Sequence, residues 1–152
     1  MLTLDAFDLD ELASALAEQD SFDHHWLLNT ATGALEYWSL DDGGDTEDEI
    51  AGPDLVEIEP IPSREWHADM ADYADRVSDV GMRRLLAAAL ESPGPFRRFR
   101  DALWGTPHET AWNDWRDVRS RRRAVQWLID EELVDAESAR AYIAQHPDPA
   151  VP

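Results

Sequence analysis

The chain of 152 residues contains no cysteine and no lysine, and these absences exclude several classes of chemistry. Without cysteine there are no disulfides, thiolate nucleophiles or zinc–thiolate sites, which fits a reducing cytoplasm. Without lysine, a Schiff base and a Walker-type phosphate loop are both excluded. All basic charge is therefore carried by guanidinium groups, which suit paired contacts with carboxylate or phosphate and stacking on aromatic rings.

Long apolar runs and a basic amino terminus are also missing. The longest aliphatic run, from Leu85 to Leu90, is far too short to span a bilayer. The first residues, MLTLDAFDLDEL, place no basic region before an apolar run and so differ from a secretory signal. We therefore expect a cytoplasmic protein with no membrane contact, and a single domain long enough to bury a core.

Positive charge is absent from the first part of the chain, and the net charge of the whole is −20. No arginine precedes Arg64, whereas residues 83–123 hold ten arginines and only five acids. Either the two parts neutralise each other within the fold, or they offer surfaces of opposite charge for self-association or for a basic partner. The overall charge repels nucleic acid at long range.

The N-terminal part of the sequence favours one helix and a small sheet. An apolar stripe behind Asp8 predicts a helix over residues 9–18, with Glu11 completing a capping pair. Gly33 suits the tight turn of a hairpin, and prolines end the last extended stretch. We predict strands over residues 25–29, 34–39 and 55–59, with a polar loop from Asp41 to Pro53.

The C-terminal two-thirds favours helices. Cap and start signals stand at Ser63, Asp79, Pro95, Thr106 with Pro107 and Glu109, and Asp135. We predict a helix capped by Ser63 that runs to Val77, and further helices over residues 80–91, 96–104, 107–130 and 136–145. The fold class is therefore α+β: a three-stranded antiparallel sheet, a hairpin plus one strand, packed by five or six helices. Residues 1–146 form one acidic domain, and residues 147–152 form a frayed tail.

The stretch from Gly94 to Leu103, GPFRRFRDAL, resembles the hallmark of a bacterial family of unknown function, uncharacterised protein family 0158. A Trp-rich, arginine-rich helix follows that block in the family, as it does here up to the segment from Ala124 to Leu128. The hairpin with its Thr-Gly turn is similar as well. Pro95 and the acidic insertion near Asp41 depart from the pattern. The resemblance supports the fold and implies no activity.

The Phe-Arg-Arg-Phe helix admits a structural and a functional interpretation. Phe96, Phe99 and Leu103 recur at helical spacing and form a stripe that faces the core. Its arginines then form either a solvated, salt-bridged face or a grip for an anion or an acidic peptide. The sequence leaves both open.

The next helix carries an arginine at an apolar position. Arg122 falls on one face with Trp115 and Val125, so it must pair with an acid or reach toward water. We expect an internal pair with an acid from the N-terminal half, or else a pocket that awaits an anionic ligand. Trp112, Trp115 and Arg119 lie one turn apart and suit stacking.

Metal and catalytic chemistry find little support in the sequence. His24 and His25 are neighbours on a strand and point to opposite faces, and no H-E-x-x-H spacing exists for His67. The acids from Asp41 to Glu49 lack EF-hand spacing. No G-x-S-x-G turn or glycine-rich phosphate loop occurs, so we predict no metal, no cofactor and no catalytic residue.

We therefore predict a non-enzymatic binding or regulatory module that contacts a protein through an Arg/Trp-rich surface. The alternatives are a nucleic-acid-binding regulator and an enzyme that binds an anionic substrate near Arg122. The candidate binding residues share a place in the helices after Gly94; they are Arg97, Arg98, Arg100, Trp104, Trp112, Trp115, Arg119 and Arg122.

Overall fold

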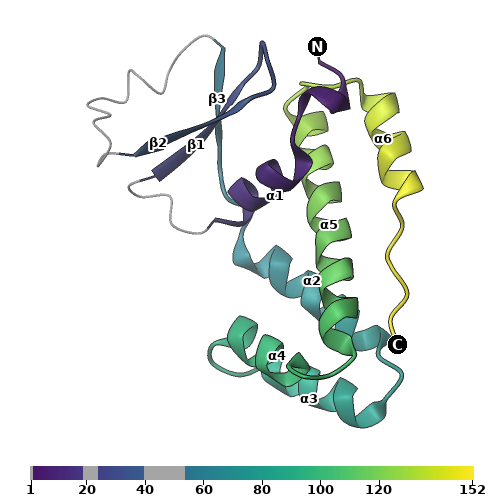
Figure 1. The fold of residues 1–152 in the computed structure, drawn as a ribbon. Helices are drawn as coiled ribbons and strands as arrows, with labels where there is room; N and C mark the ends of the chain where they lie inside the picture. Colours follow the sequence, from purple (N-terminus) through teal and green to yellow (C-terminus); the bar gives the residue numbers. More distant parts are fainter. Residues whose placement is uncertain (1, 19–23, 40–53) are drawn as a thin grey trace. The chain divides into compact units, whose positions relative to one another are not determined.

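A computed structural model describes residues 2–18, 24–39 and 54–152 (Figure 1). Within these ranges the predicted α+β class is confirmed: three antiparallel strands accompany six α-helices and one short 3₁₀ helix, η1. The predicted loop from Asp41 to Pro53 lies outside the described residues. The elements in chain order are η1 (Leu4–Ala6), α1 (Leu9–Ala17), β1 (His24–Asn29), β2 (Leu35–Ser39), β3 (Leu55–Ile58), α2 (Ser63–Arg76), α3 (Val80–Leu90), α4 (Pro95–Leu103), α5 (His108–Asp130) and α6 (Ala136–Gln145).

The chain folds as two compact units. The first comprises Met1–Ile61 with Ser120–His146, and the second comprises Pro62–Arg119 with Pro147–Pro152. Helix α5 therefore gives its first half to the second unit and its second half to the first. The expectation of one domain over residues 1–146 stays a prediction.

The first unit contains the sheet, with strand order β2-β1-β3. Leu27 and Leu28 of β1 point to opposite faces and are both buried, so both faces of the central strand are covered. Gly33 closes the hairpin with φ of 82°, and an added Cβ would meet the backbone oxygen of Ala6 at 2.5 Å. Only glycine fits this turn, which explains why the Thr-Gly sequence predicted it correctly.

Aspartate side chains cap three of the six described α-helices, as predicted. The carboxylates of Asp8, Asp79 and Asp135 accept the backbone N–H of the third residue after each of them. Pro95 occupies the first turn of α4, after Gly94. The prediction of Ser63 as a cap was wrong, because Ser63 is already the first helical residue of α2 and Pro62 precedes it without a side-chain bond.

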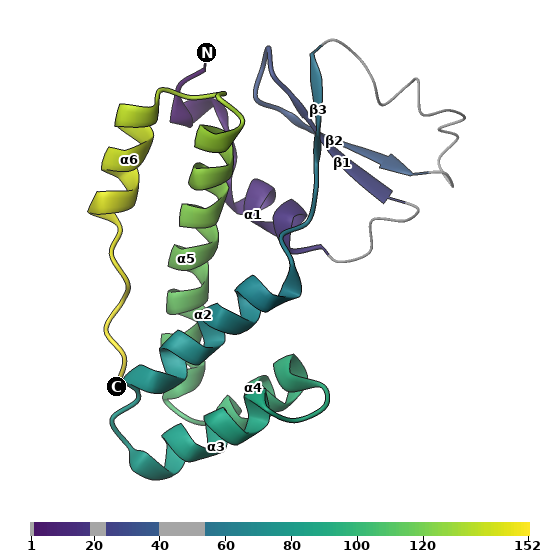
Figure 2. The same ribbon diagram turned by 180° about the vertical axis from the view of Figure 1, so that it is seen from behind.

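The second unit is helical and has an aromatic core. Helices α2, α3 and α4 pack with the first half of α5 (Figure 2). Tyr73, Phe99 and Trp115 are fully buried, and Tyr73 makes edge-to-face contacts with both of the others. The apolar stripe predicted for α4 is confirmed, since Phe99 and Leu103 are buried and Phe96 packs against the core.

The last six residues, expected to fray, make contacts with this second unit. The backbone N–H of Ser78 donates to the carbonyl of Pro152 at 3.2 Å. Val151 packs against the aromatic core, and Asp148 binds Arg119. These contacts place the C-terminal segment beside Arg119 and the aromatic core of the second unit.

Candidate functional site

Helix α4 presents its arginines to solvent. Arg97, Arg98 and Arg100 are exposed, as expected from the inward stripe of Phe99 and Leu103. Arg97 approaches Asp101 one turn later at 4.0 Å, a contact that water screens and that contributes little to stability. Arg100 forms no ion pair with any residue of the described ranges.

Trp104 ends α4 with its side chain in water, at 78% exposure. The turn that follows is closed by Thr106, whose backbone N–H and hydroxyl both donate to the carbonyl of Leu103. Gly105 adopts a φ of 71°, and its N–H donates to the carboxylate of Glu109 at 3.3 Å. Trp104 is therefore an exposed aromatic on a constrained turn. We call Arg97, Arg98, Arg100 and Trp104 the arginine–tryptophan surface.

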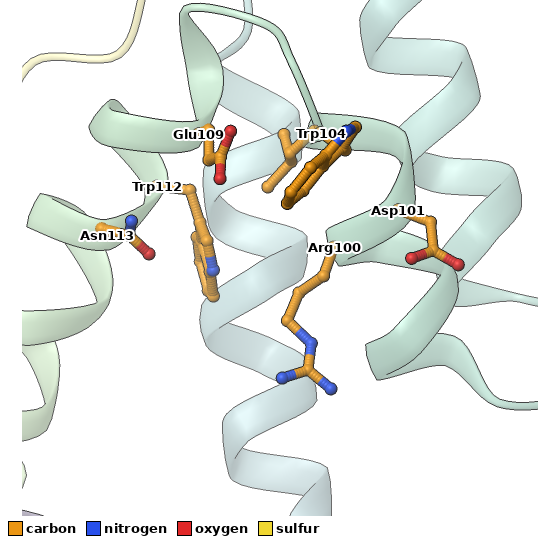
Figure 3. A pocket seen from close by; sticks show the side chains of 7 residues that line it. Arg100, Asp101, Trp104, Glu109, Trp112 and Asn113 are labelled. Atoms are coloured by element: carbon orange, nitrogen blue, oxygen red, sulfur yellow. The ribbon is translucent and has the colours of Figure 1, made fainter.

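A pocket of about 250 Å³ opens beside this surface, between the end of α4 and the start of α5. Figure 3 shows Arg100, Trp104 and Trp112 around it, with the guanidinium of Arg100 directed away from Trp104, Glu109 at the turn and Asp101 pointing away from Trp112. The lining residues are Arg100, Asp101, Leu103, Trp104, Glu109, Trp112 and Asn113. No hydrogen bond joins two of these side chains, so the polar groups of the pocket do not satisfy one another.

Trp112 gives this pocket a donor without an acceptor. The residue is 4% exposed, and its indole N–H is buried with no hydrogen-bond partner among the described residues. The nitrogen lies on the edge of the ring that faces Arg100 (Figure 3). A buried N–H without an acceptor costs roughly 1–3 kcal/mol, so its retention in the pocket calls for an explanation.

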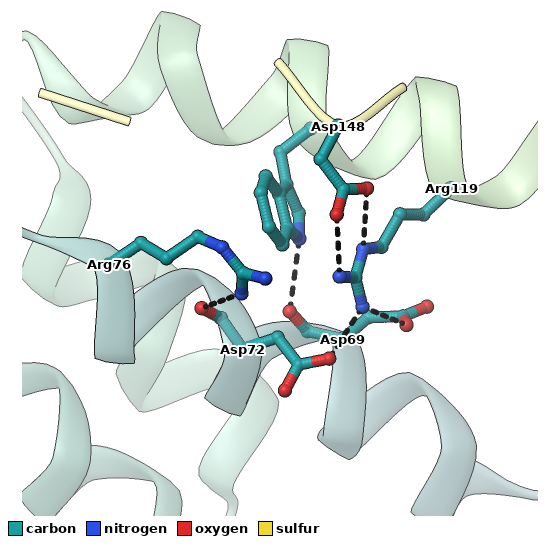
Figure 4. Close-up of polar contacts among 6 residues, drawn as sticks. Asp69, Asp72, Arg76, Arg119 and Asp148 are labelled. Carbon is teal, nitrogen blue, oxygen red and sulfur yellow. Dashed lines mark hydrogen bonds and ion pairs between the residues drawn. The ribbon is translucent and has the colours of Figure 1, made fainter. Parts of the chain in front are cut away.

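Arg119, predicted to belong to the binding surface, is held inside the second unit by three aspartates (Figure 4). Its Nε and one terminal nitrogen donate to the two carboxylate oxygens of Asp148 at 3.1 and 3.0 Å. The other terminal nitrogen donates to Asp69 at 3.1 Å and to Asp72 at 2.7 Å. The Arg119 side chain is only 13% exposed, which leaves it little surface for a partner.

The electrostatics of this cluster favour the charged guanidinium. Desolvation lowers the pKa of Arg119, but hydrogen bonds to Asp148, Asp72 and Asp69 outweigh it and raise the pKa above its ordinary value. Arg119 is therefore a permanent cation that fastens α5, α2 and the C-terminal segment together within this unit.

Trp115 lies beneath the same guanidinium. Its indole N–H donates to the backbone carbonyl of Asp69 at 3.0 Å, and the guanidinium carbon of Arg119 lies 4.3 Å from its ring centre. The predicted stacking of Trp115 and Arg119 is confirmed. Trp115 is fully buried and satisfied, so it positions the cluster and offers no surface to a partner.

The expectation for Arg122, an internal pair with an acid of the N-terminal half or a pocket that awaits an anion, stays a prediction. Its side chain is half-buried, and it is not one of the residues that line the pocket beside Arg100. One acid of the N-terminal half pairs with the neighbouring arginine: Arg121 donates to Asp10 at 2.6 Å. Arg119, three residues before Arg122, binds three aspartates.

A buried tyrosine–histidine pair lies in the core behind the pocket. The Tyr73 hydroxyl is 2.8 Å from Nδ1 of His108, a residue that is 8% exposed. Burial raises the pKa of Tyr73 to about 12. The pair is enclosed by aromatic edges, with Phe99 and Trp112 both contacting the Tyr73 ring, and so it supports the pocket wall from within.

Two residues of the types that bind metals, His67 and Asp69, have other partners in the structure. His67 Nε2 lies 3.0 Å from the carbonyl of Leu90, and Asp69 binds Arg119. Within residues 2–18, 24–39 and 54–152 no three His, Asp or Glu side chains gather in an arrangement that would hold a metal ion. None of the helices in these ranges has the length and apolar character needed to cross a bilayer.

Comparison with known proteins bears out the resemblance seen in the sequence. The family model of the Uncharacterised protein family (UPF0158) matches residues 1–143. The chain is 28% identical over 133 residues to UPF0158 protein PA5073 of Pseudomonas aeruginosa, a match that covers 85% of each chain. No solved structure matches the chain significantly.

Proposed function

Since the chain belongs to the uncharacterised protein family UPF0158, we propose its function from the site: it is a non-enzymatic binding module that holds a protein partner. The contact runs through the arginine–tryptophan surface and the pocket beside it. Two of the predicted binding residues, Trp115 and Arg119, have a structural role in this proposal. Trp115 and Arg119 hold the second unit together and leave the surface to α4.

The observation that carries the proposal is Trp104, a large aromatic residue at 78% exposure beside an arginine without an ion pair among the described residues. Tryptophan and arginine dominate the energetics of protein interfaces, because they bury large areas and bind carboxylates in pairs. The turn that carries Trp104 is closed by hydrogen bonds from Thr106 and Gly105. A constrained turn lowers the entropy lost when a partner binds.

The character of the pocket supports binding over catalysis. Nucleophilic catalysis by a side chain uses a nucleophile and a base within hydrogen-bond reach of one another. No such pair exists among the lining residues, and the carboxylate of Glu109 is already bound to the Gly105 N–H. The donors of the lining suit holding a group in place, which supports binding.

Affinity capture with matched variants tests this function. The tagged protein is compared with R97Q/R98Q/W104S and with R83Q/R84Q, a control that removes two exposed arginines from α3 in the same unit. A protein retained by wild type and by the control, lost by the α4 variant, and bound again as a purified component supports the proposal. Equal retention by all three would remove α4 from the contact.

The same variants decide between a protein and a nucleic acid. The net charge of −20 opposes a polyanion at long range. An electrophoretic mobility shift assay at low salt makes the test. If DNA or RNA binds through the α4 residues, and the logarithm of its binding constant falls linearly with the logarithm of salt concentration, the partner is a nucleic acid and not a protein. No shift at low salt is the expected result.

A further inference from the structure

We propose that the pocket between α4 and α5 binds the carboxylate of a single aspartate or glutamate side chain of the partner. The carboxylate lies between the Arg100 guanidinium and the Trp112 indole N–H, with Trp104 against its aliphatic part. This inference rests on the proposed function, and it names the chemical group that the surface recognises.

Arg100 supplies the charge. It is exposed at the mouth of the pocket and forms no ion pair with any residue in the described ranges, in a chain with 33 acidic residues. The buried arginine of the same unit, Arg119, binds three aspartates at once. An arginine left without an acid in such a chain keeps its planar donors available for a carboxylate from outside.

Trp112 supplies the second, neutral donor. It is buried, lines the pocket, and has no acceptor for its N–H among the described residues, whereas the neighbouring core tryptophan Trp115 donates to Asp69. The nitrogen edge of the Trp112 ring faces Arg100 (Figure 3). A carboxylate has two oxygens, so one oxygen satisfies the indole N–H while the guanidinium binds the group.

The size and charge of the pocket select the ligand. A volume of about 250 Å³ lies below the range of about 300–1,000 Å³ typical of small-molecule and cofactor sites, and so fits one side chain. Asp101 and Glu109 also line the pocket, so a phosphate group of charge about −1.5 to −2 would be repelled more strongly than a monoanionic carboxylate. Arg100 and the Trp112 N–H are the two donors for a monoanion, while Asp101 contacts Arg97 at 4.0 Å and Glu109 accepts the Gly105 N–H.

The charges outside the pocket bear on the kind of partner. Arg98 is exposed on the same helix and also forms no ion pair within the described residues. Arg98 projects from a different side of α4 than Arg100, because residues two apart do not share a helix face, and it does not line the pocket. The strong negative charge of the whole protein then favours a partner with a few acids over a polyanion.

The indole N–H signal of Trp112 in an amide correlation spectrum, assigned by its loss in W112F, reports on this pocket directly. The probes are N-acetyl-glutamate N-methylamide and its glutamine counterpart, which differ only in the carboxylate. We expect the glutamate compound to shift the signal in a saturable way and the glutamine compound to leave it in place. R100Q lowers the affinity for the glutamate compound on the order of tenfold or more, since a charged hydrogen bond is lost. R84Q, on α3, leaves its affinity unchanged.

Each other outcome overturns the inference. Equal shifts with both probes, or an unaltered affinity in R100Q, would show that the carboxylate is not what binds. Tighter binding of inorganic phosphate would assign the pocket to a phosphate group, and tighter binding of N-acetylglycine would assign it to a C-terminal carboxylate. One further outcome concerns the proposed function alone. If the glutamate compound binds as expected but affinity capture retains no protein through α4, the proposed function fails and the carboxylate site stands.

Discussion

The guanidinium carbon of Arg119 lies 4.3 Å from the centre of the Trp115 ring, and both residues bind Asp69 from different sides. Trp115 donates to the backbone carbonyl of Asp69, and Arg119 donates to its carboxylate. A stacked, hydrogen-bonded arrangement of this kind fixes α5 against α2 within one unit. The tryptophans and arginines of the chain therefore divide into a structural set inside this unit and a set that faces solvent on α4.

Replacing Arg119 tests the structural set. R119M leaves the buried carboxylate of Asp69 and the half-buried one of Asp148 without their cation. We expect the free energy of unfolding to fall by about 2–4 kcal/mol, somewhat below the loss for a fully buried pair because Asp72 keeps contact with water. R116M on the same helix, at an exposed pair with Asp117, should change it by less than about 0.5 kcal/mol. Urea unfolding of both variants makes the comparison, and equal losses would contradict it.

The two core tryptophans should respond differently to the same change. W115F removes the hydrogen bond to Asp69, whereas W112F removes a buried N–H that has no acceptor among the described residues. Both variants lose the same ring volume. We therefore expect W115F to be less stable than W112F by roughly 1–2 kcal/mol in chemical denaturation. A W112F variant that is the less stable of the two would mean that its N–H has an acceptor after all.

Alkaline pH should destabilise the protein through Tyr73. Its pKa rises to about 12 in the folded state from an ordinary value of 10.0, so the folded state holds this proton more tightly than the unfolded chain. The resulting stability is fully present below pH 10 and is lost as the pH rises through 12, amounting to about 2 kcal/mol. The absence of lysine and cysteine simplifies this pH range.

The matched measurement is urea unfolding of wild type and Y73F between pH 9 and pH 12, a range that covers the pKa of Tyr73 in the unfolded chain and reaches its pKa in the folded state. The difference between the two proteins should shrink as the pH rises, because the variant has no phenolic proton to lose. A difference that stays constant across the range would show that Tyr73 titrates normally.

The turn after α4 should require glycine at position 105. Gly105 has a φ of 71°, and an added Cβ meets nothing within 4 Å, so G105A costs only the backbone strain of the left-handed region, roughly 1–2 kcal/mol. G81A provides the contrast, because Gly81 lies in helix α3 outside the left-handed region, and its added Cβ meets only the Asp79 carboxylate that caps α3, at 3.2 Å, which must shift slightly. We expect G81A to be neutral or stabilising. Thermal unfolding that ranks the two variants in the opposite order would contradict this account of the turn.

Local signals in the sequence predicted local structure well. Asp8, Asp79 and Asp135 begin helices because a carboxylate three residues before a free backbone N–H satisfies it, and this requires only neighbours in the chain. Gly33 marked the hairpin for a similar reason. Ser63 failed as a cap because Pro62 stands just outside the helix and the serine falls inside it.

The sequence could not assign the arginines, since their partners are remote. Asp69, Asp72 and Asp148 are separated from Arg119 by 50, 47 and 29 residues, and nothing local distinguishes them among 33 acids. One signal was available: Arg119 follows Trp112 and Trp115 at helical spacing, on the face that proved to be buried. The sequence offered a second helix face, through Trp115 and Arg122, as an equally good candidate for burial. Periodicity alone does not decide between two such faces, and packing does.

The pocket was not predictable either, although its residues were. Arg100, Trp104 and Trp112 were all candidate binding residues, yet their convergence depends on the turn at Gly105 and on the fold of α4 against α5. Whether the indole N–H of Trp112 finds an acceptor is likewise a property of the packed core. Residue type indicated the chemistry, and the fold supplied the arrangement.

Photo-crosslinking from position 104 tests the central claim most directly. A photoreactive phenylalanine replaces Trp104 in one protein and Leu85, a 52% exposed residue of α3, in a control. Irradiation in native cells should give one discrete protein adduct from position 104, none from position 85, and a weaker adduct from position 104 when R100Q is added. Identical adducts from both positions, or none from position 104 while a partner still co-purifies, would contradict a contact through the arginine–tryptophan surface.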